Sequence, residues 1–489
     1  MTYKSNPSLG GEAVRLTISK VITLCISMAT SMLLARFRSF EEYGTYSQLL
    51  LVINLFISLL MLGLPSSINF FLARSETQEE KTRFISVFYS ISTILSLLIG
   101  VLLVLSIPLI ESYFHNPNIR HFSYFLAVFP WASIVTSSIE NVLIVFKKVR
   151  FLLVFRVLYS ISVLCTVISI QVLGFGFKTY MAVFIGVNAL FSISVYIIAS
   201  HLSGRMYICF DKNLIKTILI FSVPIGLSSV VGTINTEFDK LLIGYLLNTE
   251  QLAIYTNAAK ELPLVIIPSS ITAILLPQIS KMIKDNRTEE AIRLWGNASE
   301  LAMIVISIIV AGIITYSKEV MTILYSSKYL PGESVFRIYT LNLLLRCTYF
   351  GIILNACGET KKIFYCSLIS LGLNLILNPL FYWIFGIIGP AIATFLAILI
   401  VLLMQLKMTA KVSGIRFSKV FPWKNITIIL LINTVLAVLF GTIKTILPLE
   451  QYCGEIVESV ILGCIWCFLY TLLMRKRIIE KWHVINHEG

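Results

Sequence analysis

The sequence has few charged residues. Asp, Glu, Lys and Arg make up 13% of its 489 residues, whereas soluble domains carry about 25%. Apolar residues make up 57%, the mean hydropathy is +0.87, and runs of about 20 apolar residues, the length that crosses a bilayer, recur from end to end. This composition excludes a soluble globule. It predicts an all-α integral membrane protein, because lipid offers backbone groups no other partner and barrel strands would be shorter and alternating.

Signatures of several enzyme classes are also missing. No Gly-Lys dipeptide occurs, which excludes a P-loop. The segments between apolar runs are too short to fold a catalytic or nucleotide-binding domain, so we expect no enzyme activity, no catalytic residues and no cofactor. The polar start, MTYKSNPSLGGEAV, lacks the features of a removable signal peptide.

Nine cysteines are scattered along the chain, most of them in apolar runs. Cys464 and Cys467 form a C-x-x-C, a spacing found in redox and metal sites. No second pair and no histidine lies near them, so we interpret them as small apolar filler and predict no metal site.

Fourteen apolar segments are expected to be transmembrane helices. They cover residues 14–35, 46–72, 84–109, 122–145, 151–174, 179–200, 215–246, 251–278, 295–315, 335–355, 363–384, 388–406, 424–446 and 456–474.

The basic residues between these segments alternate. One alternate set of loops and termini carries 25 lysines and arginines and the other carries seven. Positive loops face the cytoplasm, so we expect both termini in the cytoplasm. The net charge of +14 is explained in the same way, and no nucleic-acid partner is expected.

The two halves of the sequence resemble each other. PSSI occurs at Pro65–Ile68 and again at Pro268–Ile271, and similar segments recur at offsets of about 203–212 residues. We therefore predict a six-helix lobe over 1–205, a second over 206–412, and two further helices with a basic cytoplasmic tail over 413–489. Six is even, so the repeats are parallel, and such repeats form two lobes around a central cavity, as in transporters with alternating access.

Two runs carry a family resemblance. R-S-F-E-E-Y-G-T-Y at 38–46 and D-K-L-L-I-G…E-Q-L-A-I-Y at 239–255, with the plan of six, six and two helices, resemble the bacterial polysaccharide flippases that export O-antigen and capsule repeat units. Their superfamily also holds the lipid II flippases and the multidrug extrusion antiporters. The drug antiporters usually have twelve helices, so fourteen favours the other two branches.

The resemblance implies a cargo: an oligosaccharide linked to undecaprenyl pyrophosphate, turned from the cytoplasmic to the outer leaflet with coupling to an ion gradient or the membrane potential. Membrane lipids, a polysaccharide polymerase and glycosyltransferases are the other expected partners. A lipid II flippase and a drug or cation antiporter remain alternatives, although an antiporter would prefer an acidic cleft. A membrane enzyme is disfavoured by the short loops.

Cations within the apolar segments suit this cargo, because an anionic diphosphate needs positive charge to cross hydrocarbon. Placed by helical rise, four of them lie at different depths and form a predicted substrate-binding ladder. These are Lys20, Lys240, Lys260 and Arg346.

Charge at depth also offers ion-coupling groups. Glu237 and Lys240 are three residues apart and are expected to pair, either as a packing salt bridge or as part of a functional site. A proton relay without histidine would use carboxylates, and a sodium site would use amides beside a broken helix. The candidates are Asp239, Glu237, Glu261, Asn374 and Asn378; Glu140 is expected to pair with Arg156.

Overall fold

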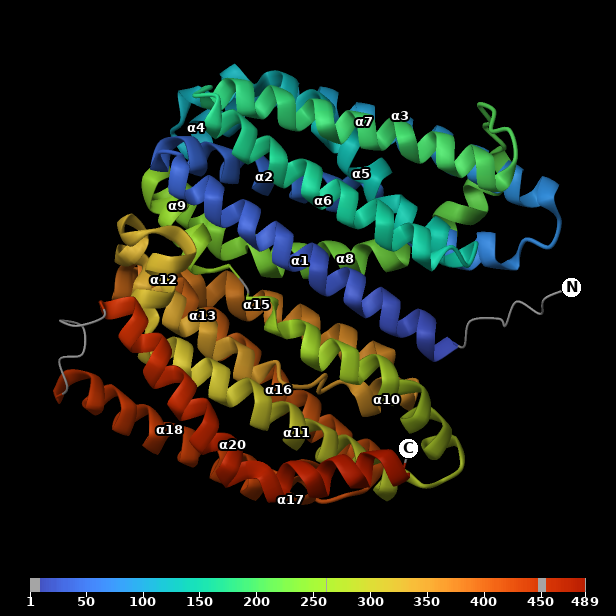
Figure 1. The fold of residues 1–489 in the computed structure, drawn as a ribbon. Helices are drawn as coiled ribbons and strands as arrows, with labels where there is room; N and C mark the ends of the chain where they lie inside the picture. The colour runs from blue at the N-terminus through green and yellow to red at the C-terminus, as the bar shows by residue number, and fades with distance from the viewer. Residues whose placement is uncertain (1–8, 261, 447–453, 489) are drawn as a thin grey trace, which may run out of the picture. The chain divides into compact units, whose positions relative to one another are not determined.

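The computed structural model describes residues 9–260, 262–446 and 454–488, and every regular element in these ranges is a helix (Figure 1). The all-α fold predicted from composition is confirmed. The chain divides into two compact units, 1–253 and 254–489.

The first unit consists of long helices joined by tight turns. Its elements are α1 (Leu9–Phe37), α2 (Phe40–Met61), the π-helix η1 (Ile68–Leu72), α3 (Gln78–Leu105), α4 (Ile107–Phe114), the 3₁₀ helix η2 (Pro117–Phe122), α5 (Ser123–Val145), α6 (Val149–Val172), α7 (Phe177–Ser203) and α8 (Lys212–Leu246); α9 (Thr249–Ala258) crosses into the second unit.

The second unit contains more interrupted helices. Its elements are η3 (Pro263–Val265), α10 (Ile266–Lys284), α11 (Thr288–Thr315), α12 (Ser317–Tyr325), η4 (Ser327–Gly332), α13 (Glu333–Leu345), α14 (Ile352–Ala356), α15 (Thr360–Phe385), η5 (Gly386–Ile388), α16 (Gly389–Ser413), α17 (Phe417–Val420), α18 (Trp423–Ile446) and α20 (Glu455–Glu488).

The number of membrane spans differs from the prediction. Within the described ranges, twelve helical stretches are long and apolar enough to cross a membrane, so the chain is a multi-pass membrane protein but fourteen spans are not confirmed. Two features account for the difference. The stretch Thr360–Ser413 contains both α15 and α16, and the segment expected at 335–355 is broken into α13 and α14.

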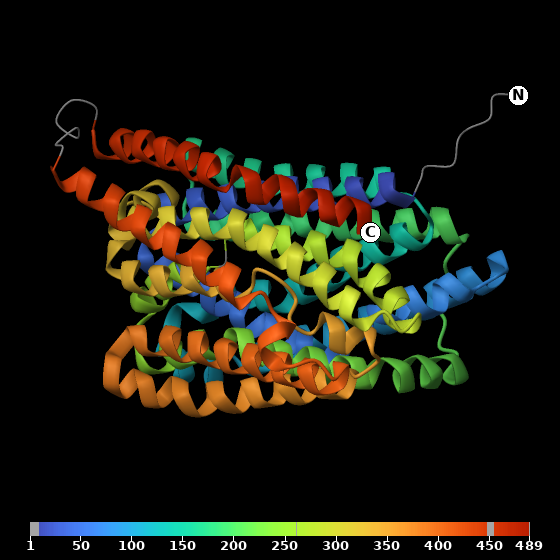
Figure 2. The same cartoon turned by 90° about the horizontal axis from the view of Figure 1, so that it is seen from below.

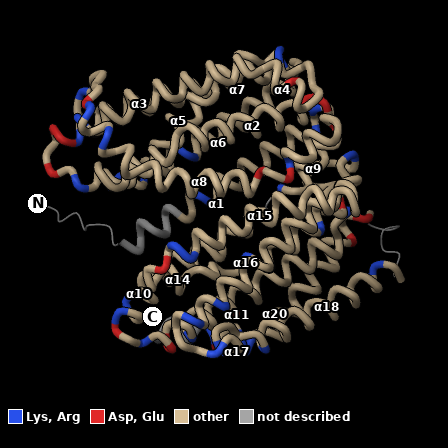
Figure 3. The backbone as a smooth tube through the Cα atoms, turned by 180° about the vertical axis from the view of Figure 1, so that it is seen from behind, with Lys and Arg blue, Asp and Glu red and all other residues tan. Residues whose placement is uncertain are grey.

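Charged residues gather at the helix ends of each unit, as Figure 3 shows, and the helix middles are mostly uncharged. The helix starts follow local chemistry. Ser39 and Thr77 each form a capping box with a glutamate three residues on. Asp211 accepts hydrogen bonds from the first backbone N–H groups of α8 and pairs with Arg83. The Leu214 N–H, and then Arg83, hold the pKa of Asp211 below its usual range.

The internal repeat is visible in the order of elements. The short helix and 3₁₀ helix α4–η2 begin at Ile107 and Pro117, and α12–η4 begin at Ser317 and Ser327, 210 residues later in both cases. By this offset α8 is the counterpart of α1. The compact units nevertheless divide after Ala253 rather than at 205, because α8 packs against α2, α3 and α4.

Glycines bring α8 into backbone contact with the end of α2. Gly63 has φ +72°, which only glycine adopts without strain. A Cβ added at Gly226 would lie 2.1 Å from the carbonyl carbon of Leu62, and one added at Gly63 would lie 2.7 Å from the nitrogen of Gly226. No side chain fits between the two segments, so this crossing fixes how α2 and α8 meet.

The C-terminal helices α18 and α20 pack on α11. Midway along α11, Glu300 is 2% exposed at its side chain and lies 3.1 Å from Lys481 Nζ of α20. Asn425 of α18 donates to the same carboxylate at 2.9 Å. Three helices are therefore joined by one buried polar cluster.

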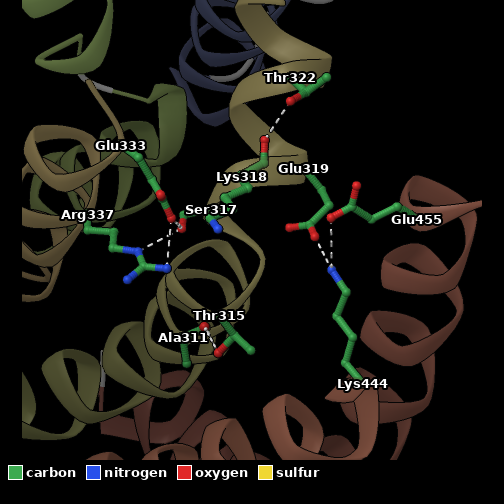
Figure 4. A network of polar contacts seen from close by, with 10 residues as sticks. All are labelled: Ala311, Thr315, Ser317, Lys318, Glu319, Thr322, Glu333, Arg337, Lys444 and Glu455. Atoms are coloured by element: carbon green, nitrogen blue, oxygen red, sulfur yellow. Dashed lines mark hydrogen bonds and ion pairs between the residues drawn. The ribbon is translucent and has the colours of Figure 1, made fainter. Parts of the chain in front are cut away.

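A second polar network lies at the C-terminal end of α11 (Figure 4). Lys444 of α18 pairs with Glu319 of α12, and its Nζ lies 3.9 Å from Glu455 of α20. Beside it, Arg337 donates to Ser317 Oγ at 2.7 Å and pairs with Glu333 at 2.7 Å. Polar contacts thus attach the C-terminal helix pair at both of its ends.

Helices α15 and α16 lie side by side as a tight hairpin (Figure 2). The side of α15 facing α16 carries buried residues at intervals of four: Cys366, Ser370, Asn374 and Asn378. The buried face of α16 includes, in its first half, one glycine and three alanines, Gly389, Ala391, Ala393 and Ala397. Small residues and polar side chains of this kind hold membrane helices together.

Candidate functional site

A pocket of about 500 Å³ lies within the second unit. Its wall comes from α10, the α13–α14 break, α15 and α16. The polar lining residues are Ser269, Thr272, Arg346, Thr348, Ser370 and Gln405, and the aromatic ones are Tyr349 and Phe350. Most of the remaining wall is aliphatic, so the pocket combines one cation with hydroxyl, amide and ring groups.

Arg346 lies where α13 stops. It follows Leu345, the last residue of the helix, and helical structure resumes only at Ile352. The C-terminal carbonyls of a helix carry partial negative charge, which favours a cation there. Residues 346–351 thus form a non-helical segment at the pocket wall, the arrangement by which discontinuous helices present binding groups at depth.

The break is fixed by a neighbouring helix. Trp295 of α11, which is fully buried, donates from its indole nitrogen to Thr348 Oγ1 at 2.8 Å. Its ring meets Phe350 edge-on, with 6.1 Å between the ring centroids. This hydrogen bond orients the segment that carries Arg346.

We expect Thr348→Val to lower the stability of the protein by about 1–3 kcal/mol, because it leaves the buried Trp295 N–H without an acceptor. Thr348→Ser keeps the hydroxyl and should remain close to the native protein. Thermal unfolding of the purified protein in detergent measures both. Equal melting temperatures for the two variants would contradict the assigned role of the hydrogen bond.

Another break precedes the pocket on the N-terminal side. The segment expected as one helix over 251–278 is divided into α9, η3 and α10, and Lys260 lies between α9 and η3. Lys260 is half-buried, and its backbone N–H bonds the Asn257 carbonyl at 3.3 Å. Glu261, the expected ion-coupling residue beside it, lies outside the described residues.

The two amide candidates lie in the α15–α16 hairpin. Asn374 and Asn378 are each 1% exposed. Thr394 of α16 donates to Asn374 Oδ1 at 3.5 Å, which joins the two helices. Ser370, one helical turn before Asn374, lines the pocket, so the polar stripe of α15 runs from the pocket into the hairpin.

In the first unit, the E-F-D-K residues lie inside α8, as predicted, and not in a loop. Lys240 Nζ donates to Glu237 Oε2 at 2.7 Å, which confirms the expected pair. Asp239 is 2% exposed, and its carboxylate accepts from the backbone N–H of Lys240. Both side chains of the pair are 21% exposed, so the two charged groups are mostly but not completely buried.

Lys20 belongs to a second charged group in the first unit. Its Nζ lies 3.9 Å from Glu140 Oε1. Arg156 of α6 pairs with the other oxygen of Glu140, which confirms the pair expected from the sequence. Asn141, next to Glu140, accepts from Asn69 of η1 at 3.1 Å. Two cations therefore share one carboxylate in this group, leaving a net positive charge.

The structure thus places two of the four predicted cations in each unit. Lys20 and Lys240 lie in separate charged groups of the first unit, while Lys260 and Arg346 lie at helix breaks of the second. Sequence reasoning missed the hydroxyl and amide lining of the Arg346 pocket. The repeated PSSI motif was the available signal, since its second copy supplies Pro268 and Ser269 to the pocket wall.

Residues 33–333 match the family described as polysaccharide biosynthesis protein. A probable low-salt glycan biosynthesis flippase, Agl15 of Haloferax volcanii, is 26% identical over 173 residues, which are 35% of this chain and 37% of that protein. The capsular polysaccharide biosynthesis protein CapF of Staphylococcus aureus is 21% identical over 240 residues, 47% of this chain and 60% of CapF. These alignments span less than two thirds of either relative.

Among solved structures, the lipid II flippase MurJ in an inward closed conformation is similar over nearly the whole chain. The TM-score is 0.72, with 18% identity, 95% of this chain covered and 100% of that one. At this identity the likeness shows a shared fold.

Proposed function

Because this chain belongs to the polysaccharide biosynthesis protein family, we propose that it flips a lipid-linked oligosaccharide from the cytoplasmic to the outer leaflet by alternating access. The proposed cargo is a repeat unit on undecaprenyl pyrophosphate, as for O-antigen or capsule. The bacterial cell membrane, cytoplasmic termini, coupling to an ion gradient or the membrane potential, and a polymerase and glycosyltransferases as partners belong to the same proposal. So does the division into six-helix repeats at 205 and 412.

The Arg346 pocket is the observation that carries this proposal. A guanidinium presents paired donors to phosphate oxygens, and the neighbouring hydroxyl and amide groups suit sugar hydroxyls. Lys20, Lys240 and Lys260 are proposed as further contacts for the diphosphate. Asp239, Glu237, Glu261, Asn374 and Asn378 remain proposed ion-coupling residues.

The proposal predicts flipping by the purified protein in liposomes. An oligosaccharide linked to undecaprenyl pyrophosphate is placed in the inner leaflet, and a membrane-impermeant glycosidase reports its arrival outside. Liposomes with the protein should make the cargo accessible faster than protein-free liposomes do. Equal rates, with correctly folded protein, would refute a flippase for this cargo.

Arg346→Gln should lower the flipping rate about 10- to 100-fold, because it removes a charge-assisted contact at the pocket. Arg337→Gln is the matched control. Arg337 lies on the same helix, pairs with Glu333 and does not line the pocket. Equal rates for the two variants would remove Arg346 from the substrate path.

Lipid II is a second candidate cargo, favoured by the fold shared with MurJ. The same liposomes loaded with lipid II distinguish the two cargoes. Faster flipping of lipid II than of a lipid-linked repeat unit without the peptide would favour the second candidate.

A further inference from the structure

A second pocket of the second unit, about 320 Å³, lies away from Arg346. It is bounded by the first turns of α11, the segment between α16 and α18, and the later part of α20. Its charged lining residues are Glu289, Arg293, Glu300, Lys419 and Lys481. We propose that this pocket binds the phosphate headgroup of an anionic phospholipid.

The buried part of the pocket, formed by Glu300 and Lys481, carries no net charge. The Glu300 carboxylate is held by Lys481 and Asn425, and Lys481 also donates to Asn297 Oδ1 at 2.9 Å. Arg293 and Lys419 are exposed by contrast. The lining therefore contains three cations and two carboxylates, and the positive excess lies at the exposed mouth, where an anion has access.

The surroundings are those of a membrane interface. The segment before α18 has two sides. Val420 and Phe421 are buried, whereas Phe417 is 42% exposed and packs 5.5 Å, centroid to centroid, from Trp423. Aromatic side chains next to basic residues are typical of the headgroup level of a bilayer, and basic pockets between membrane helices bind anionic headgroups.

An apolar surface extends from this place along α18. Leu431, Val435 and Val438 are 58%, 65% and 62% exposed. Helix α18 begins beside the pocket, whose wall includes Pro422, just before the helix, and Asn425 in its first turn. Acyl chains of a lipid seated in the pocket would lie on this surface. A soluble phosphate would make no use of it, so the arrangement favours a lipid.

Native mass spectrometry of the delipidated full-length protein tests the proposal. Phosphatidylglycerol should bind about tenfold more tightly than phosphatidylcholine with the same chains, and Arg293→Gln with Lys419→Gln should remove most of this preference. Arg416→Gln with Lys424→Gln is the matched control, since both residues are exposed in the same segment but lie outside the pocket wall. The control should keep the preference.

Three outcomes would overturn the proposal. Equal binding of the two lipids by the native protein would show that the pocket does not distinguish an anionic headgroup from a zwitterionic one. An unchanged preference in the Arg293 and Lys419 variant would place the lipid elsewhere. Displacement of phosphatidylglycerol by an equal concentration of inorganic phosphate would show that the pocket holds a free anion. Because no glycan enters the measurement, its result is independent of the flipping assay.

Discussion

Gly226→Ala is expected to prevent accumulation of the folded protein, although alanine ordinarily stabilises a helix by about 1 kcal/mol relative to glycine. The added Cβ would lie 2.1–2.4 Å from backbone atoms of Leu62. Backbone atoms cannot turn aside as a side chain can, so α2 and α8 must separate. We expect a loss of about 3 kcal/mol or more, beyond the usual range for overpacking.

Gly232→Ala is the matched control for this variant. Gly232 lies six residues later on the same helix, and nothing approaches the position of its Cβ within 4 Å. It should melt at or above the temperature of the native protein. Size-exclusion chromatography and thermal unfolding in detergent measure both variants. If Gly226→Ala is as stable as Gly232→Ala, the close contact of α2 and α8 does not exist.

Lys481→Met is expected to destabilise the protein by about 3–5 kcal/mol, because it leaves the carboxylate of Glu300 buried without its cation. The Glu300 side chain is 2% exposed, and Asn425 alone supplies no charge. Methionine keeps much of the lysine's length, so lost packing contributes little to the effect. Thermal unfolding in detergent measures the change.

Two further variants separate charge from packing. Lys476→Met makes the same substitution at an exposed position of α20 and should have little effect. Adding Glu300→Gln to Lys481→Met removes the buried charge and should recover more than half of the lost stability. No recovery in the double variant would show that Lys481 acts through packing alone.

Much of this fold could be predicted from the sequence, because hydrophobicity and charge dominate a membrane protein. The apolar segments became helices, the E-F-D-K residues lie within α8, and the family resemblance is confirmed by the match over residues 33–333. The count of fourteen spans is not confirmed. A hydropathy pattern does not reveal the break that divides 335–355 into α13 and α14, because the residues of the break include no proline and only two polar side chains, Arg346 and Thr348.

The candidate site was less predictable. Arg346 stood out as a charge at depth, but the segment that carries it is held by the hydrogen bond between Trp295 and Thr348, which are 53 residues apart in the sequence. The pairs of Glu140 with Arg156 and of Glu237 with Lys240 were predictable from the need to neutralise buried charge. The pocket lining was not, since Ser269, Ser370 and Gln405 meet only when three separate helices pack.

The packing of α8 determines where this chain can be cut. A scheme for expressing it as two co-produced fragments would ordinarily follow the repeat and cut near Arg205. That cut would take from the first fragment the helix on which the end of α2 rests at Gly63 and Gly226. The first compact unit instead includes α8 and ends at Ala253. The loop between α8 and α9, at Leu247 and Asn248, is the connection nearest that boundary and so the preferred site for a nick, an inserted tag or a circular permutation.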